Sequence, residues 1–267
     1  MIEENKIKED NITEEVMEER IDINASILEL RKKFLEIKEM GYVKTVRNGS
    51  TGIGATFEAL LGKPEDKLEL PDFKGIEIKT KRAYSKSLIT LFKAVPMGNT
   101  DFEIKRIRDK YGYPDKMDRK LKRFGATVSV EREKVGLFYK FQLKVDREKG
   151  RVILCVYDWN DICIDDSSYW EFSVLKEKLF RKLNVLARVL AWTNKIDGVE
   201  SFKYYRMNIY ILKEFDCFLE ALEEGRVKVV FNIGNYYDEE RYGNVRGHGV
   251  SFGIADEDLD SIFDIYR

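Results

Sequence analysis

Short β-prone runs alternate with amphipathic helical patterns along this chain, and that order restricts the fold more than any other feature. Apolar residues at helical spacing predict helices over residues 24–40, 53–61, 172–183 and 214–224. Runs rich in β-branched and aromatic residues predict strands over residues 75–82, 88–95, 137–145, 151–157, 185–192, 204–212 and 227–233. Helices and strands in this order predict an α/β or α+β fold around a mixed sheet.

The composition argues against several classes of protein. No run of about 18 apolar residues occurs, so no membrane-spanning helix is expected. The first 20 residues are acidic and lack the apolar region of a signal peptide. Cys155, Cys163 and Cys217 have neither metal-ligand nor disulfide-framework spacing, which predicts reduced thiols in a cytoplasmic protein. The single histidine, His248, excludes a zinc site built on several histidines.

The net charge of −1 is unevenly distributed along the 267 residues. Residues 1–20 carry eight acidic and three basic side chains, a net charge of −5, and residues 256–267 carry five acidic and one basic, a net charge of −4. Residues 21–255 therefore carry +8. Basic side chains gather between Lys105 and Arg123, a distribution that suits contacts with phosphate groups and equally suits a solvated, salt-bridged surface.

One segment, PDFKGIEIK, which ends at Lys79, combines two carboxylates and a lysine on a predicted strand. Side chains alternate along a strand, so Glu77 and Lys79 point to one face. Ile76 and Ile78 then point to the other face, into the core. Asp72 precedes the strand and can return to the face of Glu77.

Two carboxylates with hard oxygens are ligands that Mg²⁺ takes, and positions remain for water and phosphate. A metal ion there lowers the pKa of water and neutralises charge on a phosphodiester, while Lys79 can orient the water or stabilise developing charge. An acid and a lysine two residues apart on a surface strand are also common as a solvated ion pair. The bare pattern of Asp72, Glu77 and Lys79 leaves both interpretations open.

The residues around this pattern favour the catalytic interpretation. The segment NGSTGIGATFEALLG, residues 48–62, followed by residues 71–79, resembles the MvaI/BcnI type II restriction endonucleases. These are relatives of the mismatch-repair nicking endonuclease MutH, within the PD-(D/E)xK nuclease superfamily. The resemblance spans residues 21–255 and includes the segments 180–183, 219–225 and 246–249.

The resemblance implies a mixed sheet flanked by helices, with two lobes around a DNA cleft. A catalytic lobe is expected over residues 21–170 and a DNA-recognition lobe over residues 171–255. Residues 1–20 are expected to form a flexible acidic tail, and residues 256–267 an acidic C-terminal segment.

Individual site residues follow from the same resemblance. Asp72 and Glu77 match the metal ligands of the family, and Lys79 matches its catalytic lysine. Glu58 matches a helix glutamate that lies beside the active site. Thr51 is a candidate for phosphate contact, with helix capping as its favoured alternative.

The segment around His248 matches the part of the family that enters the DNA groove and reads bases. Flanking glycines let its backbone approach closely, and Arg246 and Arg241 are further candidates for base contacts. The family carries an arginine after the phenylalanine of this segment, whereas this chain has Gly253, so the target sequence stays open. Lys81 and Arg82, which follow the catalytic strand, are expected to contact the DNA backbone.

Together these features predict a type II site-specific deoxyribonuclease that hydrolyses double-stranded DNA with Mg²⁺. A MutH-type strand-nicking repair enzyme and a DNA-binding module without cleavage are the alternatives. Intact Asp72, Glu77 and Lys79 argue against the second alternative. A restriction enzyme implies a companion DNA methyltransferase encoded nearby, and the family resemblance suggests a monomer.

Overall fold

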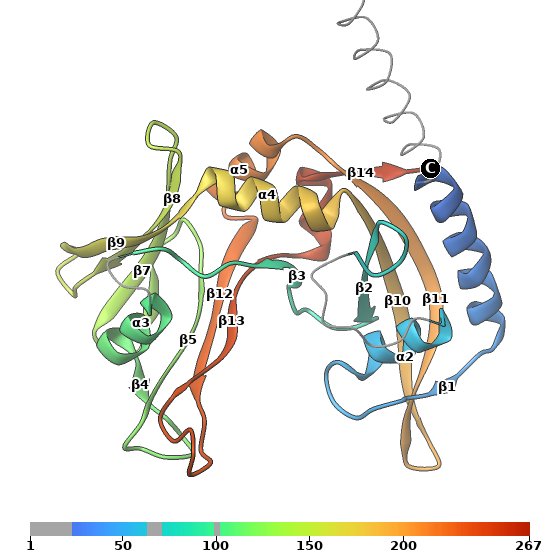
Figure 1. Ribbon diagram of the computed structural model, residues 1–267, viewed down its shortest axis with the longest axis horizontal. Helices are drawn as coiled ribbons and strands as arrows, with labels where there is room; N and C mark the ends of the chain where they lie inside the picture. Colours follow the sequence, from blue (N-terminus) through green and yellow to red (C-terminus); the bar gives the residue numbers. More distant parts are fainter. Residues whose placement is uncertain (1–22, 63–70, 99–101) are drawn as a thin grey trace, which may run out of the picture. The chain divides into compact units, whose positions relative to one another are not determined.

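The computed structural model describes residues 23–62, 71–98 and 102–267, so the predicted acidic tail over residues 1–20 lies outside the described residues (Figure 1). The chain forms two compact units, each built from separate segments. The first unit comprises the described residues up to Ser85, Arg181–Leu212 and Asp264–Arg267. The second comprises Lys86–Phe180 and Lys213–Phe263. The functional division near residue 170 stays a prediction, because these units are defined by packing alone.

A five-stranded sheet forms the first unit. Its strand order is β1 (Val43–Lys44), β11 (Val199–Leu212), β10 (Val185–Ile196) and β2 (Ile76–Arg82), and β14 (Phe263–Tyr266) also pairs with β11. β10 runs parallel to β2 and antiparallel to β11, so the sheet is mixed, as predicted.

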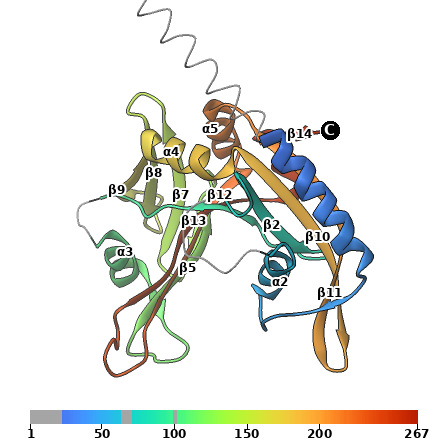
Figure 2. The same ribbon diagram turned by 45° about the vertical axis from the view of Figure 1, so that its right-hand side comes forward.

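Two helices bury their apolar sides against this sheet. The first spans residues 23–39 and is the dark-blue helix that runs along the β10–β11 hairpin in Figure 2. The second is α2 (Gly52–Leu60). Both helices were predicted, and their apolar residues pack with those of β2 and β10 in one core. The core includes Ile27, Leu30, Phe34, Ile37, Ile53, Phe57, Ile76, Ile78, Ala187 and Val189.

The β10–β11 hairpin extends further than its apolar runs predict. Apolar alternation predicts a strand over residues 185–192, yet β10 continues through exposed polar residues to Ile196. Asp197 and Gly198 connect the strands with φ values of 52° and 78°. Two residues with positive φ form the turn that matches the twist of a hairpin, and Asp-Gly is a favoured pair for it. The turn therefore supports strand pairing where burial does not.

The second unit contains two sheets. One has the order β3 (Ile89–Lys93), β13 (Val245–Ile254), β12 (Val227–Asn235), β5 (Lys122–Val128) and β4 (Tyr113–Pro114). The other has the order β6 (Glu133–Val135), β7 (Tyr139–Asp146), β8 (Arg151–Tyr157) and β9 (Cys163–Glu171). The predicted hairpin over residues 137–157 is confirmed as β7 and β8.

Aromatic side chains fill the core of the second unit. Trp170 is 1% exposed, and its indole Nε1 donates to the Ala94 carbonyl at 3.1 Å. Phe252 packs edge-on against Trp170 and stacks on Phe92. The helices of this unit are α3 (Glu103–Tyr111), α5 (Phe215–Glu223) and the 3-10 helix η1 (Asp256–Ser261). Helix α4 (Phe172–Leu183) belongs to the second unit up to Phe180 and to the first unit from Arg181. No helix among the described residues is both long enough and apolar enough to cross a membrane.

Three features differ from the expectations. β5 and β9 were not predicted, because charged and polar residues interrupt their apolar pattern. The segment around His248, for which no strand was predicted, forms strand β13, and the loop before it ends at residue 244. The acidic segment 256–267 contributes η1 and β14 to the fold.

Candidate active site

A tight turn brings Asp72 back beside strand β2. Lys74 and Gly75 have φ values of 44° and 85°, and backbone hydrogen bonds of 2.8 and 2.9 Å link Phe73 to Ile76 on both sides of them. Glycine adopts such a φ at little cost. Asp72 Oδ2 accepts a hydrogen bond from the Ile78 backbone amide at 2.9 Å. The two-residue turn therefore produces the expected return of Asp72 to the strand.

Glu77 and Lys79 lie on the same face of β2, as their spacing predicts. The Lys79 ammonium donates to Glu77 Oε1 at 2.5 Å. Glu77 is 1% exposed, whereas 23% of the Lys79 side chain reaches the surface. A buried carboxylate thus lies at the base of the site, with a lysine between it and solvent.

The second carboxylate oxygen of Glu77 has no hydrogen-bond partner among the described residues. Within the described part of the chain, Oε2 is buried and accepts no hydrogen bond. Burial raises the pKa of Glu77, while Lys79 acts in the opposite direction and the nearby charge of Asp72 raises the pKa further. An unpaired buried oxygen is costly, so this geometry favours a cationic ligand at Oε2.

The residues present fit a divalent ion that takes few protein ligands. Across the described residues, no group of three or more His, Cys, Asp or Glu side chains is arranged to hold a metal ion. Asp72 and Glu77 offer two carboxylates close enough to repel each other. Mg²⁺ is commonly held by one or two carboxylates, with its other positions taken by water and phosphate.

Lys182 is a site residue that sequence reasoning did not assign. It lies in the last turn of α4, and its ammonium is 3.5 Å from Glu77 Oε1. Strand β10 begins three residues after Lys182, and its parallel pairing with β2 places Leu186 opposite Glu77. The only sequence signal for Lys182 is a predicted helix followed by a predicted strand, because the apolar pattern does not show that β10 pairs with β2.

Arg188 also lies beside this site. It stands opposite Lys79 in the β2–β10 ladder, is 3% exposed, and donates to the Lys79 carbonyl at 2.9 Å. This bond connects the two strands at the position of the lysine. The guanidinium therefore supports the strand that carries Glu77 and Lys79.

Glu58 is half-buried on α2, near strand β2. A methyl group at Gly54 would lie 3.5 Å from Glu58 Oε1 and 3.4 Å from Thr80 Oγ1. Thr80 directly follows Lys79, so Glu58 lies at the junction between α2 and strand β2. Its predicted place beside the site agrees with this position, and its role stays a prediction.

Thr51 occupies the N-cap position of α2, but its side chain makes no capping hydrogen bond in the part of the chain that the structure describes. The capping interpretation is therefore wrong. Thr56 stabilises this end of the helix instead. Its hydroxyl donates to the Gly52 carbonyl at 2.8 Å and accepts from the Val46 amide at 3.1 Å.

Arg82 stabilises the loop before α2. Its guanidinium donates to Glu200 at 2.9 Å and to the carbonyls of Ser50 and Gly49, each at 3.2 Å. Both terminal nitrogens of Arg82 are therefore engaged within the protein. The predicted contact of Arg82 with the DNA backbone stays a prediction. Lys81 follows Lys79 on the same face of β2 and is 9% exposed.

The candidate base-reading residues belong to the second unit. Arg246 is exposed on β13 and stands opposite Gly234 of β12. Arg241 lies in the connection between these strands and forms an ion pair with Asp238 at 2.9 Å. His248 is part of β13, but its side chain lies outside the described residues.

The basic segment between Lys105 and Arg123 divides into two groups. Arg106 and Arg108 are ion-paired inside the unit, to Glu103 at 2.5 Å and to Asp109 at 2.8 Å respectively. Phosphate contact is therefore wrong for these two arginines. The basic side chains that remain exposed after β4 are Lys116, Arg119, Lys120 and Lys122.

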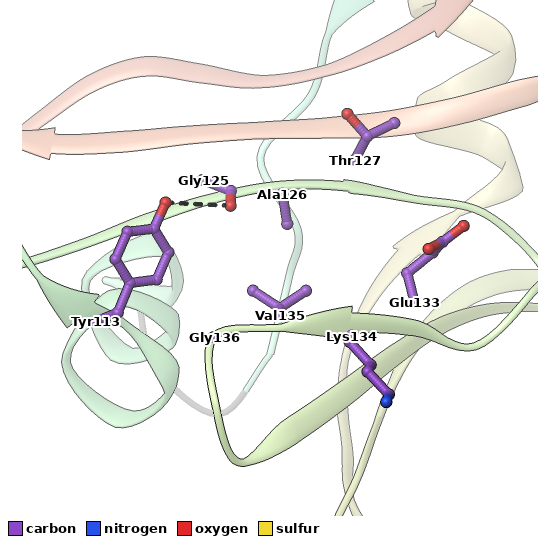
Figure 3. A pocket seen from close by; sticks show the side chains of 8 residues that line it. All are labelled: Tyr113, Gly125, Ala126, Thr127, Glu133, Lys134, Val135 and Gly136. Carbon is purple, nitrogen blue, oxygen red and sulfur yellow. Dashed lines mark hydrogen bonds between the residues drawn. The ribbon is translucent and has the colours of Figure 1, made fainter.

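A cavity of about 350 Å³ lies elsewhere in the second unit, between β5 and β6 (Figure 3). At one end of the cavity, the Tyr113 hydroxyl donates to the Gly125 carbonyl at 3.4 Å. Glu133 and Lys134 are its charged lining residues. It contains none of the predicted site residues and no pair of carboxylates, so it does not provide a second metal centre.

Known proteins resemble the chain over most of its length. The model of the MvaI/BcnI restriction endonuclease family matches residues 31–263. A solved structure described as a restriction endonuclease MvaI–cognate DNA substrate complex is similar, with a TM-score of 0.81 and 34% sequence identity over 89% of this chain and 96% of that chain. Restriction endonuclease MvaI in the absence of DNA is similar with a TM-score of 0.59 and 28% identity, over 90% and 96% of the two chains. None of the curated proteins compared with the chain matches it.

Proposed function

Because the chain belongs to the MvaI/BcnI restriction endonuclease family, we propose that it is a Mg²⁺-dependent type II restriction enzyme that cleaves double-stranded DNA at a specific short sequence. The assignment of Mg²⁺ as cofactor and of β2 as its site rests on the surroundings of the Glu77 carboxylate. One of its oxygens is bonded to Lys79, and the other is buried without a partner among the described residues. The similar MvaI structure contains cognate DNA, which supports double-stranded DNA as the substrate.

Asp72 and Glu77 would hold the metal ion. When bound, Mg²⁺ supplies positive charge to the phosphate and makes a nearby water more acidic. Asp72 is held in place by the Ile78 amide, and Glu77 by Lys79, so both ligands are oriented before substrate arrives. Lys79 lies between Glu77 and solvent, where its ammonium orients the attacking water and stabilises charge as it develops on the phosphate.

Sequence recognition falls to the second unit in this proposal. Arg246, His248 and Arg241 are the base-reading candidates, since arginine pairs with guanine through two hydrogen bonds and histidine donates to purine N7. Thr51 and Lys81 are candidates for contacts with the DNA backbone. The proposal also includes a monomeric enzyme, a cytoplasmic location and a companion DNA methyltransferase encoded nearby.

The function is tested with the purified protein, Mg²⁺ and unmethylated plasmid DNA, followed by sequencing of the ends. A type II restriction enzyme produces discrete fragments that share one short sequence at their ends and carry 5′-phosphates. Nicks in one strand alone would replace the proposal with the MutH-type alternative. Intact plasmid under conditions in which the protein binds DNA would instead favour a binding module.

Lys182→Ala is expected to slow cleavage about 10- to 100-fold, the usual effect of removing a group that supports a metal ligand. Lys182 adds a second positive charge beside Glu77, and Glu77 must remain ionised to bind Mg²⁺. Lys176→Ala, an exposed position on the same helix, is the matched control. Cleavage rates are measured over a range of Mg²⁺ concentrations. Equal rates for the two variants would exclude Lys182 from the site.

A further inference from the structure

Tyr236, the first residue after β12, lies beneath both candidate base-reading arginines. The guanidinium carbon of Arg241 is 4.0 Å from the centroid of its ring, and that of Arg246 is 5.8 Å away. The face of an aromatic ring attracts a cation over this range. Arg241 is also neutralised by Asp238. Arg246 has no carboxylate partner among the described residues, so the ring is the contact that orients it.

The neighbours of Tyr236 on both sides are bonded to one buried carboxylate. Asn235 Nδ2 donates to Asp115 Oδ2 at 3.0 Å, and the Tyr237 hydroxyl donates to the same oxygen at 2.7 Å. Asn235 and Asp115 are each 2% exposed. Successive side chains of an extended chain point in opposite directions. Fixing residues 235 and 237 toward Asp115 therefore turns Tyr236 toward the arginines.

A buried arginine ties both ends of the 236–244 connection to α3. Arg108 is 5% exposed, and its Nη1 donates to Asn235 Oδ1 at 2.7 Å and to the Gly243 carbonyl at 3.0 Å. Burial acts to raise the pKa of Asp115, but hydrogen bonds from Tyr237, the Met117 amide and Asn235 hold that pKa below its usual value. Asp115 thus remains an acceptor for both of its partners at neutral pH.

We propose that Tyr236 is a positioning residue for sequence discrimination. Its ring holds the Arg246 guanidinium in the orientation needed to pair with a base edge, and Asp115 fixes the ring by anchoring both of its neighbours. The inference rests on the proposed function, in which Arg246 reads a base. In this inference, Asp115 and Arg108, the buried charged residues of the segment 105–123, fix the connection that carries Tyr236 rather than contact phosphate.

Tyr236→Leu keeps an apolar side chain but removes the ring face, whereas Tyr236→Phe removes only the hydroxyl. The quantity measured is kcat/KM on the cognate duplex divided by kcat/KM on single-mismatch duplexes. Tyr236→Leu is expected to lower this ratio about tenfold, the size of one lost base contact. The loss is expected on the cognate duplex, with little change on the mismatched ones. Tyr236→Phe is expected to keep the wild-type ratio, because the ring remains.

Tyr157→Leu is the matched control, since the Arg132 guanidinium also lies 4.0 Å from the ring of Tyr157 in the same unit. It removes an equal cation–ring contact away from the 236–244 connection and is expected to leave the ratio unchanged. Asp115→Asn is the second test should Tyr236→Leu fail to fold, and it is expected to lower the ratio in the same direction. Thermal unfolding of each variant identifies any loss of the fold.

Arg246→Ala separates this inference from the function on which it rests. If Arg246→Ala lowers the ratio while Tyr236→Leu and Asp115→Asn both keep it, the positioning role of Tyr236 is overturned and base reading by Arg246 stands. If Arg246→Ala itself leaves the ratio unchanged, base reading by Arg246 is wrong and the inference is overturned with it. In both cases the proposed Mg²⁺-dependent cleavage of DNA still stands, because it depends on Asp72, Glu77 and Lys79.

Discussion

Glu77→Gln is expected to abolish DNA cleavage while DNA binding persists. Glutamine preserves the shape of the side chain but removes the negative charge that a hard cation needs, and it leaves Lys79 and Lys182 without their shared partner. We expect a rate loss of at least about 10³-fold, the upper range for removal of one electrostatic group from an active site. Phosphate contacts from other lysines and arginines are expected to preserve binding.

The measurement is single-turnover cleavage of a labelled cognate duplex, with binding followed by fluorescence anisotropy at low salt. Glu36→Gln, an exposed acid on the helix over residues 23–39, is the matched control. Asp72→Asn is expected to be equally inactive. Asparagine retains an oxygen for the Ile78 amide, so this variant separates the loss of a metal ligand from the loss of the turn. Near-normal cleavage by either acid-to-amide variant would remove that residue from the metal site.

Removal of divalent metal is expected to stop cleavage completely, and Mg²⁺ or Mn²⁺ is expected to restore it. Ca²⁺ is expected to support binding with little turnover, because it accepts looser coordination and activates water poorly. Both effects follow from the two carboxylates and from Glu77 Oε2, which accepts no hydrogen bond from the residues that the structure describes. Persistent cleavage in excess EDTA would contradict the metal mechanism.

Thermal unfolding provides a readout of metal binding that does not depend on activity. A ligand at a hundred times its Kd stabilises the native state by about 2.7 kcal/mol. For a chain of this size that corresponds to an increase of roughly 5 °C in Tm. Ca²⁺ is therefore expected to raise the Tm of the wild-type protein and of Glu36→Gln. The same addition is expected to leave Glu77→Gln unchanged, and an equal increase in all three would place the cation elsewhere.

Local patterns were sufficient to predict the elements that carry the proposed catalytic residues. Helical spacing located α2, and the alternation of isoleucine with Glu77 and Lys79 assigned one face of β2 to the core and the other to the site. The position of Asp72 beside β2 depended only on a turn of two residues. Each of these features arises within a few positions of the chain, so the sequence pattern contains the information.

Contacts between distant segments were not predictable in the same way. Lys182 reaches Glu77 because β10 pairs with β2, and nothing in either strand specifies its partner. The bond from Arg108 to Asn235 joins residues 127 positions apart, and the basic segment around Arg108 resembled a solvated surface. β5 and β9 were missed because their partners, rather than their own apolar content, stabilise them.

The pairing of β2 with β10 also determines the point in synthesis at which the candidate active site can first be complete. The strand with Glu77 emerges from the ribosome early, but its parallel neighbour begins at Val185. The residues between them, Lys86–Phe180, belong to the second unit. A nascent chain that ends before α4 therefore has both proposed metal ligands but neither Lys182 nor the sheet that buries Glu77. Cleavage activity is expected to arise only after more than two thirds of the chain has been made.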